Sequence, residues 1–254
     1  MRGRLTARCL IGALIGAALL VAAAGARWRG IPAAEAAPSD LRCRPGPAGA
    51  PAGAEWAAAT PPDVRIVVDL SAFRLDLYVE GAIKKSYPVA IGRPTARTKS
   101  PIGEWRVTDK SIEPGGEFGT RWIGLNVPWG SYGIHGTSQP WTIGGRASAG
   151  CIRMFNHDVE EVYEWVQIGT PVTIKGEIPA GGLRRWLRRG DVGEDVVYVQ
   201  LRLDALGFAA EGADGRYGPR TERAVRRLQR LFGLPEDGSV SPDVYSILGF
   251  DPPI

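Results

Sequence analysis

Apolar and polar residues alternate in short runs through the middle of this 254-residue chain. The alternation is clearest over residues 74–79, and a β-rich apolar run at 64–70 precedes it. Alternation with a period of two places one face of a strand against a core. We therefore predict strands at these two segments and at five more, which are 82–91, 104–111, 121–127, 132–135 and 170–174.

One helical segment interrupts the predicted strands. Asn156 is the predicted N-cap, Asp158 lies in the first turn, and an amphipathic pattern continues to Val166. Many short strands separated by Gly- and Pro-containing turns, together with one helix, favour an antiparallel β-sandwich or a barrel. We assign this mainly β domain to residues 63–176.

The C-terminal part of the chain has a helical period instead. Its apolar residues form two stripes at helical spacing. The first stripe is Val196, Val199, Leu201, Leu203 and Leu206, and the second is Val225, Leu228, Leu231 and Phe232. These stripes predict the core of a small all-α domain over residues 187–250, joined to the β domain by a linker at 177–186.

The N-terminal residues have neither pattern. Three arginines precede an apolar run at 9–26, and small-residue cleavage motifs lie at its end and just downstream. Residues 1–37 are therefore predicted to be a signal peptide or, since the run is near the minimum length for a spanning helix, an uncleaved membrane anchor. Residues 38–62 form a Pro/Ala/Gly-rich linker. Both alternatives place the folded part outside the cytoplasm, in the cell wall or periplasm.

The net charge of +4 is confined to this N-terminal segment. The first 60 residues carry seven arginines and three acidic residues, and the rest of the chain is neutral. A neutral folded part has no basic surface excess to attract a polyanion. The composition therefore excludes nucleic acid as a partner, and a membrane contact is expected only through the possible anchor.

Candidate chemistry centres on one histidine and one cysteine. His135 lies in Tyr132-Gly-Ile-His-Gly-Thr137, and Cys151 lies in Ser148-Ala-Gly-Cys-Ile-Arg-Met154. Residues 139–147 between them have the composition of a turn that brings its ends together. A thiol and an imidazole that face each other are the minimum for a thiolate nucleophile and its base. The alternative for Cys151 is a buried small apolar residue.

Residues beside Cys151 offer supporting roles. Gly150 leaves room for substrate, and the backbone N–H groups of Gly150 and Cys151 are candidates for an oxyanion hole. Arg153 is suited to binding a carboxylate, with a structural salt bridge as the alternative. Ser148 either orients the loop or the histidine, or stabilises a turn.

A metal centre is not indicated. The chain has two histidines and one usable cysteine, which do not make a zinc site, and we predict no cofactor. His157, at the start of the predicted helix, is assigned to the surface. Cys43 lies in the linker and is expected to be free or paired between molecules, because a bond to Cys151 would silence the nucleophile.

These motifs resemble the signature of the YkuD-type L,D-transpeptidases, in which a His-Gly-Thr segment precedes a Ser-x-Gly-Cys-x-Arg segment. Residues 91–105 and 118–121 resemble further family regions in the same order. The resemblance places Gly136 and Thr137 in the motif as supporting residues. Many members have histidine where this chain has Ala149, which we interpret as a change in the pocket lining.

The resemblance implies a β-sandwich with its site in a groove at one side. It implies that Cys151 attacks the diaminopimelate carbonyl of a tetrapeptide stem, expels D-Ala and forms a thioester. An amine from a second stem then completes a 3→3 cross-link, with His135 as base and then acid. Residues 187–250 resemble a three-helix peptidoglycan-binding domain whose surface lies around 214–221, so peptidoglycan is the expected partner.

Two other catalytic functions and one non-catalytic function are alternatives. Water as acceptor would make the chain an L,D-carboxypeptidase or a related wall hydrolase. A sortase-like transpeptidase shares the order of histidine and cysteine but lacks the Gly-Cys-x-Arg context. A non-catalytic peptidoglycan-binding scaffold is the third, and the helical domain alone is alternatively a packing module without a ligand.

Overall fold

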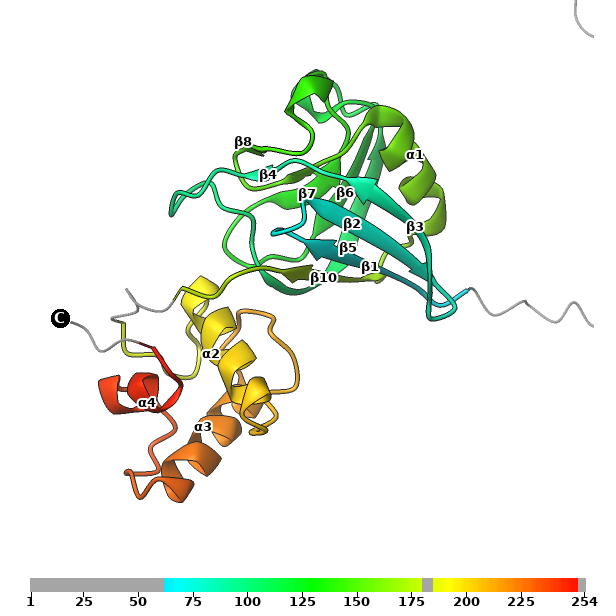
Figure 1. The fold of residues 1–254 in the computed structure, drawn as a ribbon. Helices are drawn as coiled ribbons and strands as arrows, with labels where there is room; N and C mark the ends of the chain where they lie inside the picture. Colours follow the sequence, from blue (N-terminus) through cyan, green and yellow to red (C-terminus); the bar gives the residue numbers. More distant parts are fainter. Residues whose placement is uncertain (1–61, 180–184, 251–254) are drawn as a thin grey trace, which may run out of the picture. The chain divides into compact units, whose positions relative to one another are not determined.

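The computed structural model describes residues 62–179 and 185–250 (Figure 1). The predicted signal peptide or anchor, nearly all of the predicted N-terminal linker, and Cys43 lie outside the described residues. Within the described ranges, no helix is long and apolar enough to cross a bilayer.

Residues 62–179 form a mainly β domain around one eight-stranded sheet. Its strand order is β3-β2-β1-β10-β5-β6-β7-β9, and β4 and β8 make a separate two-stranded sheet. The ten strands are β1 Val64–Asp69, β2 Arg74–Val79, β3 Ala82–Pro88, β4 Ile91–Gly92, β5 Gly103–Ile112, β6 Arg121–Leu125, β7 Tyr132–His135, β8 Arg146–Ser148, β9 Ile152–Arg153 and β10 Pro171–Lys175.

The ten-residue strand β5 connects the two halves of the eight-stranded sheet. Residues 103–106 pair with β10, and residues 107–112 pair with β6. The sheet curls around a core (Figure 1). The predicted mainly β class is therefore confirmed, although the pairing is mixed: β1 with β10, β7 with β9, and β4 with β8 are parallel.

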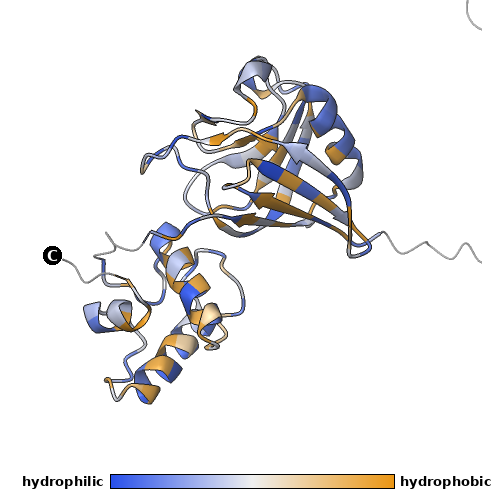
Figure 2. Ribbon diagram, viewed as in Figure 1, coloured by the Kyte–Doolittle hydropathy of each residue, from blue (hydrophilic) through white to orange (hydrophobic). Residues whose placement is uncertain are grey.

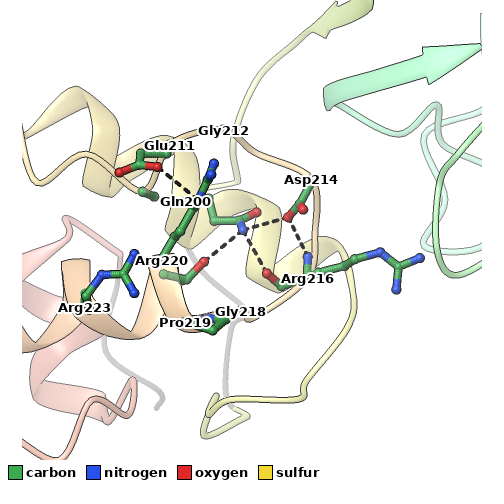
Figure 3. A pocket seen from close by; sticks show the side chains of 11 residues that line it. Gln200, Glu211, Gly212, Asp214, Arg216, Gly218, Pro219, Arg220 and Arg223 are labelled. Carbon is green, nitrogen blue, oxygen red and sulfur yellow. Dashed lines mark hydrogen bonds and ion pairs between the residues drawn. The ribbon is translucent and has the colours of Figure 1, made fainter. Parts of the chain in front are cut away.

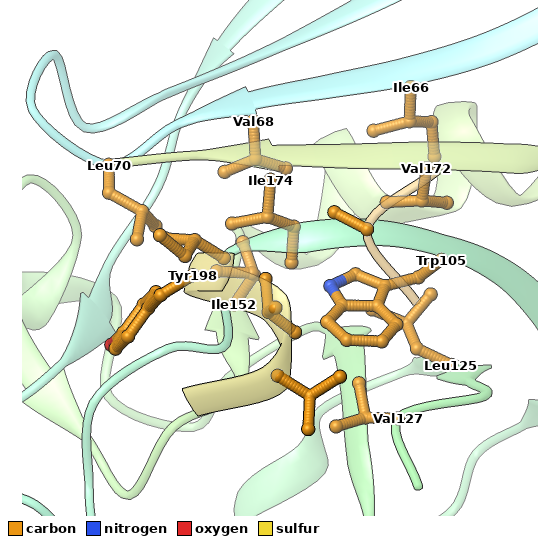
Figure 4. Close-up of a cluster of buried hydrophobic side chains, with 14 of the residues drawn as sticks. Ile66, Val68, Leu70, Trp105, Leu125, Val127, Ile152, Val172, Ile174 and Tyr198 are labelled. Atoms are coloured by element: carbon orange, nitrogen blue, oxygen red, sulfur yellow. The ribbon is translucent and has the colours of Figure 1, made fainter. Parts of the chain in front are cut away.

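The core of this domain comes from the inward faces of neighbouring strands (Figure 4). Along β1, buried residues alternate with more exposed ones, and Figure 2 shows that the strands of this sheet carry both hydrophobic and hydrophilic residues. Ile66 and Val68 of β1 and Val172 and Ile174 of β10 are at most 2% exposed. The buried indole of Trp105 donates a hydrogen bond to the Pro101 carbonyl at 3.1 Å, so its polar atom is satisfied inside the core.

The sequence pattern located most strands. The observed β2 and β7 match the predicted ranges to the residue, whereas the short strands β8 and β9 were not predicted. Helix α1 spans Asn156–Trp165, close to its predicted range. The N-cap prediction was wrong: Phe155 is the cap residue, and the Asn156 side chain instead accepts a hydrogen bond from the Thr137 N–H.

Residues 185–250 form a small helical domain with α2 Glu194–Ala205, α3 Pro219–Leu231 and α4 Pro242–Ile247. Most predicted core residues are fully buried, namely Val196, Val199, Leu203, Val225 and Leu228. Leu206, Leu231 and Phe232 were predicted wrongly, because they are 52%, 70% and 53% exposed. All three lie at helix C-termini, where Gly207 and Gly233 turn the chain with positive φ.

Candidate active site

The pairing of β7 with β9 brings the two candidate catalytic residues together. These strands run parallel, with Ile134 opposite Ile152 and His135 opposite Arg153. Cys151 directly precedes β9, and the register of the two parallel strands places it beside Gly133 of β7. The thiol therefore lies beside the strand that carries the imidazole. The predicted pair is brought together by neighbouring parallel strands and not by the two arms of a tight turn.

His135 is held in one orientation. It is 2% exposed, and its Nδ1 lies 2.6 Å from the Gly136 carbonyl oxygen. Since a carbonyl only accepts, Nδ1 is the donor, and the neutral ring keeps its lone pair on Nε2. Trp122 stacks on the imidazole with centroids 5.7 Å apart, and Phe118 meets it edge-on at 5.1 Å. Neither ring was predicted as a neighbour of the histidine.

The imidazole is uncharged at neutral pH. Burial lowers the pKa of His135 to about 4, and the Arg153 guanidinium acts in the same direction. Backbone carbonyls of Gly136 and Phe118 oppose this shift without cancelling it. His135 is therefore a base with an available lone pair.

The thiol is also uncharged at rest. Burial raises the pKa of Cys151, while the hydrogen bond from Gly133 and the charge of Arg153 lower it by less. We expected the imidazole to increase the thiolate fraction. The structure instead favours a neutral thiol beside a neutral imidazole, so the proton must move as the sulfur reacts.

Ser148 holds the cysteine loop. Its hydroxyl donates to the Cys151 carbonyl at 2.6 Å and accepts from the Gly150 N–H at 3.0 Å. Both predicted roles of Ser148, orienting the loop and stabilising a turn, are compatible with this geometry. The same hydrogen bond occupies the Gly150 N–H, which is therefore not free for an oxyanion hole. Gly150 has φ +129°, and a Cβ there would lie 2.7 Å from the Tyr132 ring, so glycine permits close packing.

Replacing Ser148 with alanine is expected to lower both stability and reactivity. The Gly150 N–H and the Cys151 carbonyl lose their shared partner, which should cost about 1–3 kcal/mol of unfolding free energy. The alkylation rate of Cys151 at pH 7.5 should fall as well, because the loop that positions the thiol is no longer held. Urea unfolding and iodoacetamide kinetics measure both effects. Ser138→Ala, an exposed serine in the same domain, is the matched control, and equal behaviour of the two variants would contradict the role.

Gly136 and Thr137 shape the chain after His135. The Asn156 side-chain oxygen accepts from the Thr137 N–H at 2.9 Å, and the Thr137 hydroxyl accepts from the Gln139 N–H at 3.0 Å. A Cβ at Gly136 would lie 2.2 Å from that Asn156 oxygen. Asn156 therefore supports the site from the start of α1. The only sequence signal for this role was its position two residues after the Cys-x-Arg-Met motif.

Arg153 is a largely buried cation with weak partners. Its side chain is 11% exposed, and it lies 3.7 Å from a Glu117 carboxylate oxygen and 3.5 Å from the Gln139 side-chain oxygen. Its Nε has no hydrogen-bond partner in the described part of the chain. A nearly buried guanidinium with spare donors can bind a carboxylate. Both predicted roles of Arg153 are compatible with these contacts.

Two residues near the motif are turned towards solvent. Ala149 is exposed between the buried Ser148 and Gly150, so it lines the surface beside the thiol. The side chain of His157 is 78% exposed, which confirms its surface assignment.

The helical domain has its own concave site, a cavity of about 470 Å³ (Figure 3). The buried Gln200 organises its wall by donating to Asp214, Arg216 and Thr221 and accepting from the Gly215 N–H at 2.9 Å. The cavity lining combines the charged residues Glu211, Asp214, Arg216, Arg220 and Arg223. It includes most of the predicted surface at 214–221. Its charged lining could bind a ligand that itself carries carboxylates and polar groups.

His135 is expected to make stability depend on pH. Its folded pKa is about 4, below the ordinary value of about 6.5, so the unfolded chain binds the proton more tightly. The contribution of the neutral His135 to the free energy of unfolding is therefore fully present above about pH 6.5. About 3 kcal/mol of this free energy is lost by pH 4. Urea unfolding of wild type and His135→Asn at both pH values measures it. The variant should lack this loss and His157→Asn should keep it, whereas identical pH dependence in all three proteins would contradict the burial argument.

Comparison with known proteins gave matches in both domains. The model of the L,D-transpeptidase catalytic domain (YkuD) matches residues 63–174, and that of the "Putative peptidoglycan binding domain" matches residues 192–248. "Putative L,D-transpeptidase YkuD" of Bacillus licheniformis is 43% identical over 110 residues, covering 43% of this chain and 64% of that relative. "Putative L,D-transpeptidase YqjB" of Bacillus subtilis is 33% identical over 129 residues, covering 45% of this chain and 72% of that relative. Among solved structures, an L,D-transpeptidase from Mycobacterium tuberculosis H37Rv aligns with a TM-score of 0.40 and 22% identity, over 45% of this chain and 58% of that chain.

Proposed function

Because the chain belongs to the YkuD family of L,D-transpeptidase catalytic domains, we propose that it forms 3→3 cross-links in peptidoglycan through a cysteine thioester. The observation that carries this proposal is the placement of Cys151 beside β7, whose last residue is the buried, neutral His135. Around the free thiol of Cys151, His135 is the base and Arg153 is the cation.

Acylation begins with the thiol proton. His135 accepts it on Nε2 as the sulfur attacks the diaminopimelate carbonyl of a tetrapeptide stem. The amide bond to the terminal D-Ala then breaks, and the imidazolium returns the proton to the leaving amine. A thioester and free D-Ala result. The low pKa of His135 suits the second transfer, because a weakly basic imidazole gives up its proton readily.

Deacylation repeats these steps with a different nucleophile. The side-chain amine of a second stem attacks the thioester, an amide forms, the C–S bond breaks, and a proton from the amine returns to the sulfur through His135. The Cys151 N–H is the remaining candidate donor for the oxyanion, since Ser148 occupies the Gly150 N–H. Arg153 would hold a stem carboxylate.

The helical domain would keep the enzyme on its polymeric substrate. Its cavity carries cations and carboxylates that match the charged groups of a stem peptide. Binding there raises the local concentration of stems at the catalytic domain, without any new catalytic contact. Secretion or anchoring by residues 1–37 would deliver both domains to the cell wall or periplasm.

Product analysis tests the proposed reaction. Purified protein is incubated with disaccharide-tetrapeptide, and the products are identified by mass spectrometry. A dimer that has lost one D-Ala supports the transpeptidase. Tripeptide without dimer would move the assignment to an L,D-carboxypeptidase. Unchanged substrate, with folded protein that still binds sacculi, would favour a non-catalytic scaffold.

A further inference from the structure

The active site contains a carboxylate that the proposed mechanism does not use. Glu117 belongs to the short helical turn Gly116–Phe118. Its Oε2 is 3.7 Å from the Arg153 guanidinium, and the next side chain, Phe118, contacts the His135 ring at 5.1 Å. The Glu117 side chain is 72% exposed, whereas that of Arg153 is 11% exposed. Glu117 is therefore the outer member of this pair and faces the solvent from which a substrate arrives.

Glycines on both sides of Glu117 shape the backbone of this segment. Gly115 and Gly116 have φ values of 81° and 60°, and a Cβ on either would meet nothing within 4 Å, so their conformation and not crowding favours glycine. At the other end, a Cβ on Gly119 would lie 2.2 Å from the Asn156 side-chain oxygen. The segment is thus anchored against the same asparagine that supports the chain after His135.

The contact between Glu117 and Arg153 is weak enough to be exchanged. At 3.7 Å it is an ion pair without a hydrogen bond, and the Nε of Arg153 has no partner among residues 62–179 and 185–250. A substrate carboxylate that binds Arg153 directly would replace this contact with shorter, charge-assisted hydrogen bonds. Glu117 would then be a carboxylate without a cation, close to the base that serves the acceptor.

We propose that Glu117 is the acceptor-selecting residue, and that its carboxylate binds the ammonium group of the second stem beside His135. This inference rests on the proposed transpeptidase function and adds the recognition of its second substrate. An aliphatic amine carries a proton at neutral pH, so it arrives as a cation. A carboxylate attracts this cation more strongly than it attracts a neutral water molecule, which is the competing acceptor. The ammonium releases one proton to solvent before attack. The neutral amine then forms the amide while its second proton passes through His135 to the departing sulfur.

The test compares wild type, Glu117→Gln and Glu117→Asp, with Glu113→Gln as the matched control. Glu113 is an exposed acid four residues away. Acylation is followed by intact-protein mass with a disaccharide-tetrapeptide donor whose side-chain amine is acetylated and therefore cannot act as acceptor. The ratio of dimer to hydrolysed donor (tripeptide) is measured as the concentration of a separate stem with a free side-chain amine varies. We expect Glu117→Gln to raise the acceptor KM by about three- to fivefold, as for loss of an exposed ion pair. Acylation and the rate at saturating acceptor should not fall.

Two further readouts separate recognition from general damage. Glu117→Asp should keep most of the acceptor preference, and added salt should shrink the difference between wild type and Glu117→Gln. An unchanged dimer-to-tripeptide ratio in Glu117→Gln would overturn the inference, as would an equal change in Glu113→Gln. Absence of any acyl-enzyme in wild type would instead overturn the proposed function itself, so the two failures are distinguishable.

Discussion

Alanine at position 151 is expected to abolish cross-linking, with a rate loss of about 10⁴-fold or more. The reason is covalent: without the sulfur, the carbonyl has no nucleophile, and His135 has no proton to accept. The thiol lies in a free cysteine whose loop is held by Ser148. Quantifying dimer by mass spectrometry, with folding checked by circular dichroism, measures the effect.

The matched control for this prediction is Cys43→Ala. It removes a thiol of the same chemistry from the predicted linker, and it should leave the cross-linking rate within about twofold, a change small compared with loss of the nucleophile. Cross-linking that survives in Cys151→Ala but disappears in Cys43→Ala would reverse the assignment of the nucleophile.

Loss of the imidazole is expected to have the second largest effect. His135→Ala should lower kcat/KM by about 10²- to 10⁴-fold, the usual contribution of a positioned acid and base. His157→Ala removes the other histidine, whose side chain is 78% exposed, and should behave as wild type. Steady-state rates at neutral pH measure both.

The pH dependence distinguishes a base from a structural residue. In wild type, His135 is neutral above about pH 4, so its titration should not limit the rate between pH 5.5 and 7.5. In His135→Ala the thiol must ionise unaided, and since burial raises the Cys151 pKa, the residual rate should climb with pH throughout this range. Parallel profiles for the two proteins would show that His135 does not act on the thiol proton.

Local patterns predicted most of the architecture. Alternation located β2 to the residue, the predicted strand at 132–135 matches β7, and helical spacing located the buried stripes of α2 and α3. Periodicity failed where elements end: Leu206, Leu231 and Phe232 continue the apolar pattern but lie at or beside helix caps, where the chain turns away from the core. Strands β8 and β9, of three and two residues, are too short to carry a period.

The family motifs predicted the catalytic pair, and the family matches confirm the resemblance. They did not reveal how the pair meets. The composition of residues 139–147 suggested a turn that brings its ends together, but β7 and β9 are parallel neighbours, and parallel strands need a longer connection. Asn156 and Trp122 lie outside the motifs, and tertiary contacts alone place them beside Gly136 and His135.

Electrostatics was the least predictable property of the site. A cysteine next to a histidine suggested a partly ionised thiol, because contact with an imidazole stabilises a thiolate. In the structure, burial acts on both groups and keeps both neutral. Burial depends on the packing of β6, β7 and the 115–119 segment around the ring, which no spacing of residues encodes.

The central claim is that Cys151 carries the acyl group, and intact-protein mass spectrometry tests it most directly. Wild-type protein is incubated with a disaccharide-tetrapeptide whose diaminopimelate side-chain amine is acetylated, so that it is a donor and not an acceptor. The reaction is then quenched in acid, and the protein is digested to locate the adduct. We expect an adduct with the mass of the donor minus D-Ala, mapped to Cys151 and released by hydroxylamine. Product formation without an adduct at Cys151, or an adduct at another residue, would contradict it.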